Sequence, residues 1–193
     1  IAVFATGGIG GVHRGAETSF DVSADLQELA RTPVTVVCAG AKAILDLAKT
    51  LEILETQGVP VVAYRQDAFP AFWSRDSGLA APLRLDDPAA IAGFMAARAR
   101  LTEFGHGGML VANPVPADHE IPMDEMAGVI EQAVGEAARA GVTGKAVTPW
   151  LLARILEITD GRSLKTNIAL VEANARLAAR IAVEYAKTGA GAD

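Results

Sequence analysis

The chain has 193 residues, enough for one sizeable α/β domain with a real hydrophobic core. Hydrophobic residues make up 51% of it and charged residues 21%, which excludes global disorder, and a net charge of −6 without a basic cluster disfavours a nucleic-acid partner. A single cysteine excludes an internal disulfide, and no apolar run approaches the roughly 20 residues that span a bilayer. We therefore expect a cytoplasmic protein that binds neither nucleic acid nor a membrane.

Short apolar runs alternate with helical stretches along the whole chain. Strands are predicted at Ala2–Ala5, Val34–Cys38, Val59–Tyr64, Leu83–Leu85 and Gly108–Val111. Helices are predicted to start near Asp25 and Lys42 and to cover Pro88–Arg100, Met123–Ala140, Pro149–Thr159 and Ser163–Lys187. Because the strands are short and continuously apolar, they indicate a mainly parallel sheet. We expect an α/β fold with helices on both faces of that sheet, a three-layer α/β/α arrangement.

The chain opens at Ile1 inside a predicted strand and has no initiator methionine. A domain rarely begins in the middle of a sheet. We therefore expect residues 1–193 to form a single α/β catalytic domain that lacks its N-terminal portion.

A glycine-rich segment follows the first strand and reads Thr6-Gly-Gly-Ile-Gly-Gly-Val-His-Arg-Gly15. Glycines let backbone amides approach an anion closely. Thr6, His13 and Arg14 add a hydroxyl, an imidazole and a guanidinium, which suit a phosphate group. The segment matches neither the dinucleotide fingerprint nor a Walker loop. It predicts a phosphate site of unspecified class, or else a tightly folded loop without a ligand.

Two carboxylates lie four residues apart in the next segment, Phe20-Asp-Val-Ser-Ala-Asp-Leu26. Divalent cations such as Mg²⁺ or Mn²⁺ take oxygen ligands, so Asp21 and Asp25 are candidates to contact a metal or a substrate. The alternative is that Ser23 or Asp25 is an ordinary helix N-cap. Both interpretations stay open from these residues.

Lys42 follows an apolar strand and is predicted to lie in the first turn of a helix. The partial positive charge of a helix N-terminus destabilises a cation there by roughly 0.3–1 kcal/mol. In apolar surroundings such an amine loses its proton more readily and becomes a nucleophile toward carbonyls. The alternative is a surface lysine whose aliphatic stem lies over the helix end.

Other polar residues give weaker indications. His106 and His119 lack zinc-ligand spacing, and His106 is predicted to lie in a turn. Asn167, near the start of the last helix, is either an active-site amide or a partner for nearby backbone groups.

Taken together, these segments resemble the pseudouridine-5′-phosphate glycosidase family, which includes the indigoidine synthase A-like proteins. The resemblance rests on the glycine-rich segment, the Asp21–Asp25 segment and Val37-Cys-Ala-Gly-Ala-Lys42, and it runs nearly end to end. Later matching segments are Tyr64-Arg65, Phe69-Pro-Ala-Phe72, Ala112-Asn-Pro-Val-Pro116, Ser163-Leu164 and Asn167-Ile-Ala-Leu170.

The resemblance implies reversible cleavage of the C–C glycosidic bond of pseudouridine 5′-phosphate to uracil and ribose 5-phosphate. It implies that Lys42 forms a Schiff base with C1′ of the opened ribose and that Asp21 lies at a Mn²⁺ site. Residues implied to bind substrate are Ser23, Ala24 and Asp25, Thr6 and His13 in the phosphate loop, and Asn167. The family also suggests a homotrimer.

The chemistry supports the same assignment. Common glycosidases protonate an oxygen or nitrogen leaving group between paired carboxylates, and a C–C bond offers no such group. A lysine on C1′ offers another route, in which an iminium forms at C1′ while protonation of the uracil carbon lets the C–C bond break, as in a retro-aldol step.

The departures from the family pattern concern the proton donor. The family's proton-donating glutamate and a second substrate lysine belong to a region N-terminal to this chain. A smaller difference is Val171-Glu-Ala-Asn174, where many members have two adjacent asparagines, and from this we expect little consequence. The alternatives are a Schiff-base aldolase acting on another sugar phosphate, or a catalytically incomplete module that binds a sugar phosphate or nucleotide.

Overall fold

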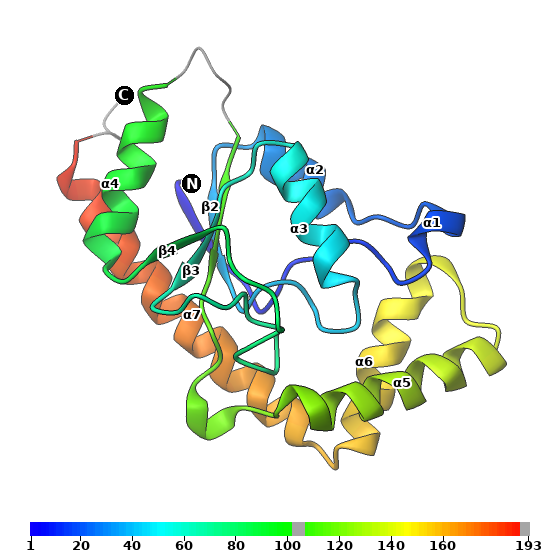
Figure 1. Ribbon diagram of the computed structural model, residues 1–193. Helices are drawn as coiled ribbons and strands as arrows, with labels where there is room; N and C mark the ends of the chain where they lie inside the picture. The colour runs from blue at the N-terminus through cyan, green and yellow to red at the C-terminus, as the bar shows by residue number, and fades with distance from the viewer. Residues whose placement is uncertain (102–106, 190–193) are drawn as a thin grey trace.

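Five strands form one parallel sheet in the computed structural model, which describes residues 1–101 and 107–189 (Figure 1). His106 lies outside the described residues. The strands are β1 Val3–Ala5, β2 Thr35–Cys38, β3 Val61–Tyr64, β4 Leu83–Leu85 and β5 Met109–Ala112, in the order β1-β2-β5-β3-β4. Every predicted strand is confirmed, and all neighbouring strands pair in parallel. Helices lie in the connections between β1 and β2, β2 and β3, and β4 and β5, whereas β3 is joined to β4 by a long loop.

The α-helices are α1 Ala16–Ser19, α2 Ala24–Arg31, α3 Leu47–Thr56, α4 Pro88–Ala99, α5 Met123–Arg139, α6 Val147–Ile158 and α7 Arg162–Lys187. Short 3₁₀ turns, η2 Ala117–His119 and η3 Gly144–Ala146, precede α5 and α6. Helix α4 starts where the sequence predicts. The Asp87 side chain caps the helix by accepting from the Ala89 amide, and Pro88 occupies the first turn. Helix α1, which is only four residues long, was not predicted.

Two hydrophobic cores lie on opposite faces of the sheet. Val36 and Cys38 of β2 belong to the core that includes α2 and α3, whereas Val37 belongs to the core under α4 and α7. Successive strand residues point to opposite faces, so a strand buried on both sides reads as a continuous apolar run. The expected three-layer α/β/α arrangement is therefore confirmed, and Figure 1 shows α7 running along one face of the sheet.

The prediction of a helix at Lys42 is wrong, because α3 begins at Leu47. In a helix starting at Lys42, the amide of Asp46 would donate to the Lys42 carbonyl. That amide donates instead to the carbonyl of Val12 at 2.8 Å, and Asp46 itself caps α3 by accepting from the amide of Lys49. Pairing with the glycine-rich segment thus keeps residues 42–46 out of the helix.

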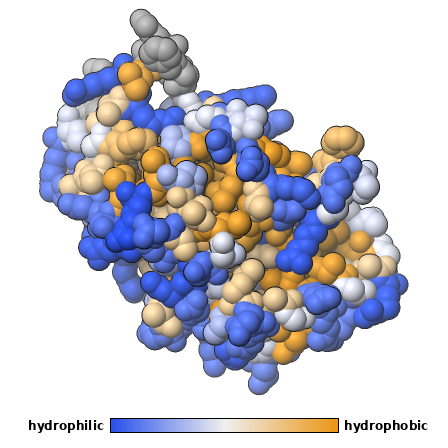
Figure 2. Space-filling model, viewed as in Figure 1, coloured by the Kyte–Doolittle hydropathy of each residue, from blue (hydrophilic) through white to orange (hydrophobic). Residues whose placement is uncertain are grey.

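Helices α5 and α6 pack against each other beside the sheet (Figure 1). Arg154 of α6 forms a bidentate ion pair with the carboxylate of Glu136 in α5, which connects the two helices. Figure 2 shows a broad hydrophobic patch across the middle of this face of the molecule, bordered by hydrophilic residues. Within the described ranges, no helix is both long and apolar enough to cross a membrane.

Candidate active site

The predicted site residues gather where the strands end. The glycine-rich loop follows β1, the Lys42 segment follows β2, and Asn113 follows β5. In open α/β sheets, ligands bind in the crevice outside the carboxyl ends of the strands. The loops at this edge are joined by backbone hydrogen bonds, from Ala39 to the Gly7 carbonyl at 2.8 Å and from Ile9 to the Gly40 carbonyl at 3.1 Å.

Lys42 lies in an irregular segment whose backbone is fixed from both sides. Its amide donates to the Ile9 carbonyl at 3.1 Å, and its carbonyl accepts from the amide of Leu45 at 3.0 Å. The side chain is half-buried, while Ala41, Ala43 and Leu45 around it are buried. Among the described residues, none forms a hydrogen bond or ion pair with its ammonium group. The apolar neighbours expected around Lys42 are present, but Lys42 does not lie at a helix N-terminus as expected, because α3 begins at Leu47.

Two helices hold the later half of the glycine-rich loop by its amides. The amide of Gly10 donates to the Asp25 carboxylate at 2.7 Å, and the amide of Val12 donates to Thr50 Oγ1 at 3.0 Å. Both contacts need glycine, because a Cβ on Gly10 would lie 2.2 Å from Ser23 Oγ and one on Gly11 would lie 2.4 Å from Thr50 Oγ1. The loop is therefore fixed against α2 and α3.

Ser23 is the N-cap of α2, and its hydroxyl accepts from the amide of Asp25 at 3.2 Å. The capping alternative is thus confirmed for Ser23. Its own amide donates to the Gly11 carbonyl at 2.9 Å, which ties the cap to the loop. Ala24 is exposed in the first turn of the helix. The Ser23–Asp25 stretch lies directly beside the glycine-rich loop.

The first half of the loop keeps free amides. Within the part of the chain that the structure describes, the amides of Gly7 and Gly8 donate to no protein acceptor. Thr6 and Gly8 line a hollow of about 270 Å³, and Asp25 lines the same hollow. Unpaired loop amides next to a hollow suit an oxyanion.

His13 and Asp21 form a second polar pair beside the loop. The imidazole Nδ1 lies 3.9 Å from the Asp21 carboxylate, and the His13 amide donates to the Asp21 carbonyl at 3.0 Å. No group of three or more His, Cys, Asp or Glu side chains among the residues with described positions is arranged to hold a metal ion. A cation here would have one carboxylate and one imidazole, and water or substrate oxygens would complete its coordination.

Asn167 contacts the loop that follows β3. Its Oδ1 accepts a 2.8 Å hydrogen bond from the indole of Trp73, which is 1% exposed. Trp73 packs edge-to-face on Phe72, whose ring lies against Gly8, where a Cβ would be 2.6 Å away. Asn167 therefore reaches the glycine-rich loop through two aromatic rings. Among the residues that the structure describes, its side chain bonds no backbone group near the helix start, which was the alternative.

Cys38 is excluded as a nucleophile. It is fully buried at the end of β2, and its thiol donates to the Gly40 carbonyl. Burial raises the pKa of the Cys38 thiol to about 12, so it stays protonated near neutral pH.

Asn174 is a residue of this edge to which the sequence reasoning gave no role. It is completely buried, and its Nδ2 donates to the carbonyls of Thr6 at 2.8 Å and Gly7 at 3.4 Å. Its Oδ1 accepts from Asn113 Nδ2 at 3.0 Å. Asn174 follows Asn167 by seven residues, or two helical turns, so both occupy one face of α7. That spacing was the available signal.

The family model described as indigoidine synthase A like protein matches residues 1–184. A pseudouridine-5′-phosphate glycosidase from Paracoccus denitrificans is 70% identical over 188 residues, covering 96% of this chain and 60% of the relative. One from Solibacter usitatus is 66% identical over 182 residues, covering 94% and 60%. The chain thus spans about three-fifths of the length of these curated relatives.

Two solved structures share the fold. The prealnumycin C-glycosynthase in complex with ribulose 5-phosphate superposes with a TM-score of 0.91 at 34% identity, covering 98% of this chain and 62% of that one. An indigoidine synthase A-like protein from Thermotoga maritima gives a TM-score of 0.85 at 39% identity, covering 95% and 59%. With the family model matched over residues 1–184, the chain belongs to the indigoidine synthase A-like family.

Proposed function

We propose that this chain is the larger part of a lysine-dependent C–C glycosidase that cleaves pseudouridine 5′-phosphate to uracil and ribose 5-phosphate. The observation that carries the proposal is Lys42, a half-buried amine with no described partner, among apolar neighbours and beside a loop with free amides. The relatives named as pseudouridine-5′-phosphate glycosidases support the substrate. A related fold that holds ribulose 5-phosphate supports a sugar phosphate as ligand.

In the proposed reaction, the Lys42 amine bonds to C1′ as the C1′–O4′ bond breaks, and the proton that the nitrogen loses goes to O4′, which opens the ribose ring. The C1′–uracil bond then breaks, and its electron pair goes to the uracil carbon, which takes up a proton. The nitrogen lone pair becomes the C=N bond of a Schiff base. Water hydrolyses the Schiff base, which releases ribose 5-phosphate and regenerates the amine, so the net reaction consumes one water. In the reverse direction the same groups join uracil to the sugar.

The proposed phosphate site is the first half of the glycine-rich loop. The amides of Gly7 and Gly8 are free to donate, the Thr6 side chain adds a hydroxyl, and His13 lies at the far end of the loop. Ser23, Ala24 and Asp25 are proposed to contact the sugar, since they adjoin the same loop. Asn167 is proposed to act at the base side, where its amide already meets Trp73.

We propose Mn²⁺ as the cofactor, with Asp21 as its protein ligand and His13 near enough to assist. Bound there, the ion would offset the negative charge of the substrate phosphate. The backbone hydrogen bond between His13 and Asp21 by itself closes the segment of residues 13–21.

The proton that goes to uracil is proposed to come from a glutamate outside this chain. A homotrimer and a cytoplasmic location complete the proposal. The family resemblance supports the trimer, and the lone cysteine, buried as a thiol, suits a reducing compartment.

Borohydride trapping with ribose 5-phosphate, read by peptide mass, tests the proposal. A reduced adduct on Lys42 is expected, and no covalent adduct at all would leave only a binding module. Uracil release from pseudouridine 5′-phosphate by the full-length protein is the second measurement. An adduct without uracil release would favour an aldolase that acts on another sugar phosphate.

A further inference from the structure

We infer that Asn174 is a positioning residue that aims the free amides of Gly7 and Gly8 at a bound phosphate group. The inference rests on the proposed phosphate site in the glycine-rich loop. It concerns a residue of α7 that is completely buried and that the proposed reaction does not itself use.

The orientation of the Asn174 amide is fixed by its neighbours. Its Nδ2 meets the carbonyls of Thr6 and Gly7, which only accept hydrogen bonds. Its Oδ1 accepts from Asn113 Nδ2 at 3.0 Å. Asn113 is held in turn by a 2.7 Å hydrogen bond from its backbone N–H to the Cys38 carbonyl. A flipped Asn174 amide would place oxygen against both loop carbonyls.

The planar trans peptide transmits this contact to the amides. In each peptide unit the carbonyl of one residue and the N–H of the next point in opposite directions. The Thr6 carbonyl bonds to Asn174, so the N–H of Gly7 points away from α7. The Gly7 carbonyl accepts from Asn174 and, at 2.8 Å, from Ala39, so the N–H of Gly8 also points away from that side.

Asn174 holds the loop differently from the other two anchors. Asp25 and Thr50 accept from the amides of Gly10 and Val12 and so occupy those donors. Asn174 binds carbonyls and therefore leaves the donors of Gly7 and Gly8 available. The loop thus has a later half whose donors at Gly10 and Val12 are occupied and a first half whose donors at Gly7 and Gly8 are free.

Loss of the Asn174 hydrogen bonds to the Thr6 and Gly7 carbonyls would let Gly7 and Gly8 sample other backbone conformations, because glycine has little steric restriction. Each amide that leaves its position removes a charge-assisted hydrogen bond from the phosphate. We expect the dissociation constant for inorganic phosphate to rise about tenfold in Asn174→Leu, which is similar in size and has no donor.

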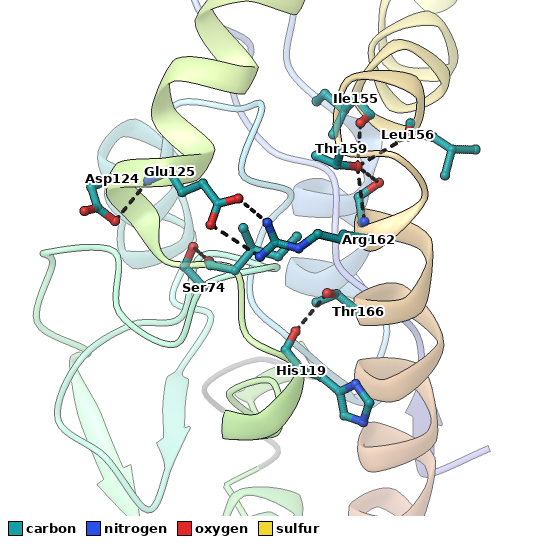
Figure 3. Close-up of polar contacts among 11 residues, drawn as sticks. Ser74, His119, Asp124, Glu125, Ile155, Leu156, Thr159, Arg162 and Thr166 are labelled. Carbon is teal, nitrogen blue, oxygen red and sulfur yellow. Dashed lines mark hydrogen bonds and ion pairs between the residues drawn. The ribbon is translucent and has the colours of Figure 1, made fainter.

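The matched control is Thr166→Val. Thr166 lies two turns earlier on α7, is 3% exposed, and its hydroxyl donates to the His119 carbonyl at 2.8 Å (Figure 3). This variant also removes a hydrogen bond from a buried side chain of α7 to loop backbone, but the bond goes to the η2 turn and not to the glycine-rich loop. We expect its phosphate affinity to stay within about twofold of the wild type.

The experiment titrates inorganic phosphate into the wild type and both variants by calorimetry, and it follows the backbone amides of the wild type by NMR. The expected result is a selective loss in Asn174→Leu, with phosphate-dependent shifts at Gly7 and Gly8 that exceed the shift at Gly10, whose donor is already occupied. If Asn174→Leu does not fold, Asn113→Ala replaces it, because this change removes the donor that orients the Asn174 amide, and the same selective loss of phosphate affinity is expected. Equal losses in both variants, no phosphate binding by the wild type, or phosphate binding without shifts at Gly7 and Gly8 would each overturn it.

A second readout separates this inference from the proposed function. Borohydride trapping is compared with ribose 5-phosphate and with ribose, and Asn174→Leu is expected to lose about tenfold of the preference for the phosphate ester while the rate at saturation stays unchanged. A fall in the saturating rate with the preference intact would contradict positioning of the amides. If the wild type forms no adduct, the proposed function fails, and the phosphate titration alone decides the role of Asn174.

Discussion

The carboxylate of Asp25, in the first turn of α2, accepts a 2.7 Å hydrogen bond from the amide of Gly10. This bond connects a helix of one outer layer to the loop that follows the edge strand β1. The same carboxylate lines the hollow beside Thr6 and Gly8. Asp25 therefore shapes the loop and also faces the space where the sugar is proposed to bind.

Asp25→Ala is expected to destabilise the protein by about 1–3 kcal/mol, because the buried Gly10 amide loses its acceptor. Urea unfolding measures the stability, and trapping with ribose 5-phosphate measures the site. Both are expected to fall. A variant of wild-type stability would show that the Gly10 amide finds another acceptor or water.

Gly10→Ala and Gly11→Ala are expected to destabilise the protein by several kcal/mol, since a Cβ would lie 2.2 Å from Ser23 Oγ or 2.4 Å from Thr50 Oγ1. The matched control is Gly93→Ala within α4, where a Cβ meets nothing within 4 Å. That change is expected to stabilise the helix by about 0.5–1 kcal/mol. Thermal melts of the three variants give the comparison.

Lys42→Ala is expected to abolish covalent trapping while ribose 5-phosphate still binds, because the phosphate contacts lie on another loop. Lys49→Ala is the control, since Lys49 forms surface ion pairs with Glu17 and Asp46. Peptide mass after borohydride treatment reads the result. A full yield of adduct in Lys42→Ala would remove Lys42 from the mechanism.

Asp21→Asn is expected to weaken Mn²⁺ binding at least tenfold, because an amide oxygen replaces the only carboxylate within 4 Å of His13 among the described residues. The control is Asp118→Asn, since Asp118 lies 3.7 Å from the exposed imidazole of His119 but far along the chain from the loop. Electron paramagnetic resonance of added Mn²⁺ measures free and bound ion. Equal binding by the wild type and Asp21→Asn would place the metal elsewhere.

Acid is expected to weaken the contact between α5 and α6. Hydrogen bonds from Arg154 lower the pKa of Glu136 from 4.5 to about 2. A lowered carboxyl pKa in the folded state stabilises the protein above about pH 4.5, and this contribution is lost as the pH falls toward 2. The difference in urea midpoint between the wild type and Glu136→Gln should therefore shrink across that range. Glu131→Gln, on the same helix, serves as the control, and a difference independent of pH would contradict the assignment.

The three central strands β2, β3 and β5 were predictable from sequence because they are buried on both faces, and runs such as Val34–Cys38 are therefore almost entirely apolar. The start of α3 was not predictable in this way. Residues 42–46 have helix-compatible side chains, but the amide of Asp46 is committed to the Val12 carbonyl, a contact 34 residues away in sequence that no local pattern contains.

The candidate site was likewise predictable only where local sequence was sufficient. Lys42 and the glycine-rich loop were visible as motifs, because their residue types suggest chemistry on their own. Asn174 was not, because an asparagine in a long helix is unremarkable until the carbonyls of Thr6 and Gly7 are known to meet it. The role of the Asn167 amide likewise depends on Trp73, which is distant in sequence.

The glycine-rich loop is held by α2 and α3 from one outer layer and by α7 from the other. A ligand that binds only the ordered loop must therefore stabilise both layers at once, by an amount set by its concentration and affinity. Saturation with phosphate should slow hydrogen exchange in α2 and in α7 together, although the later part of α7, at Leu177 and Ile181, packs in a different core from α2. The loop thus makes two halves of the molecule open as one cooperative unit whenever the site is filled.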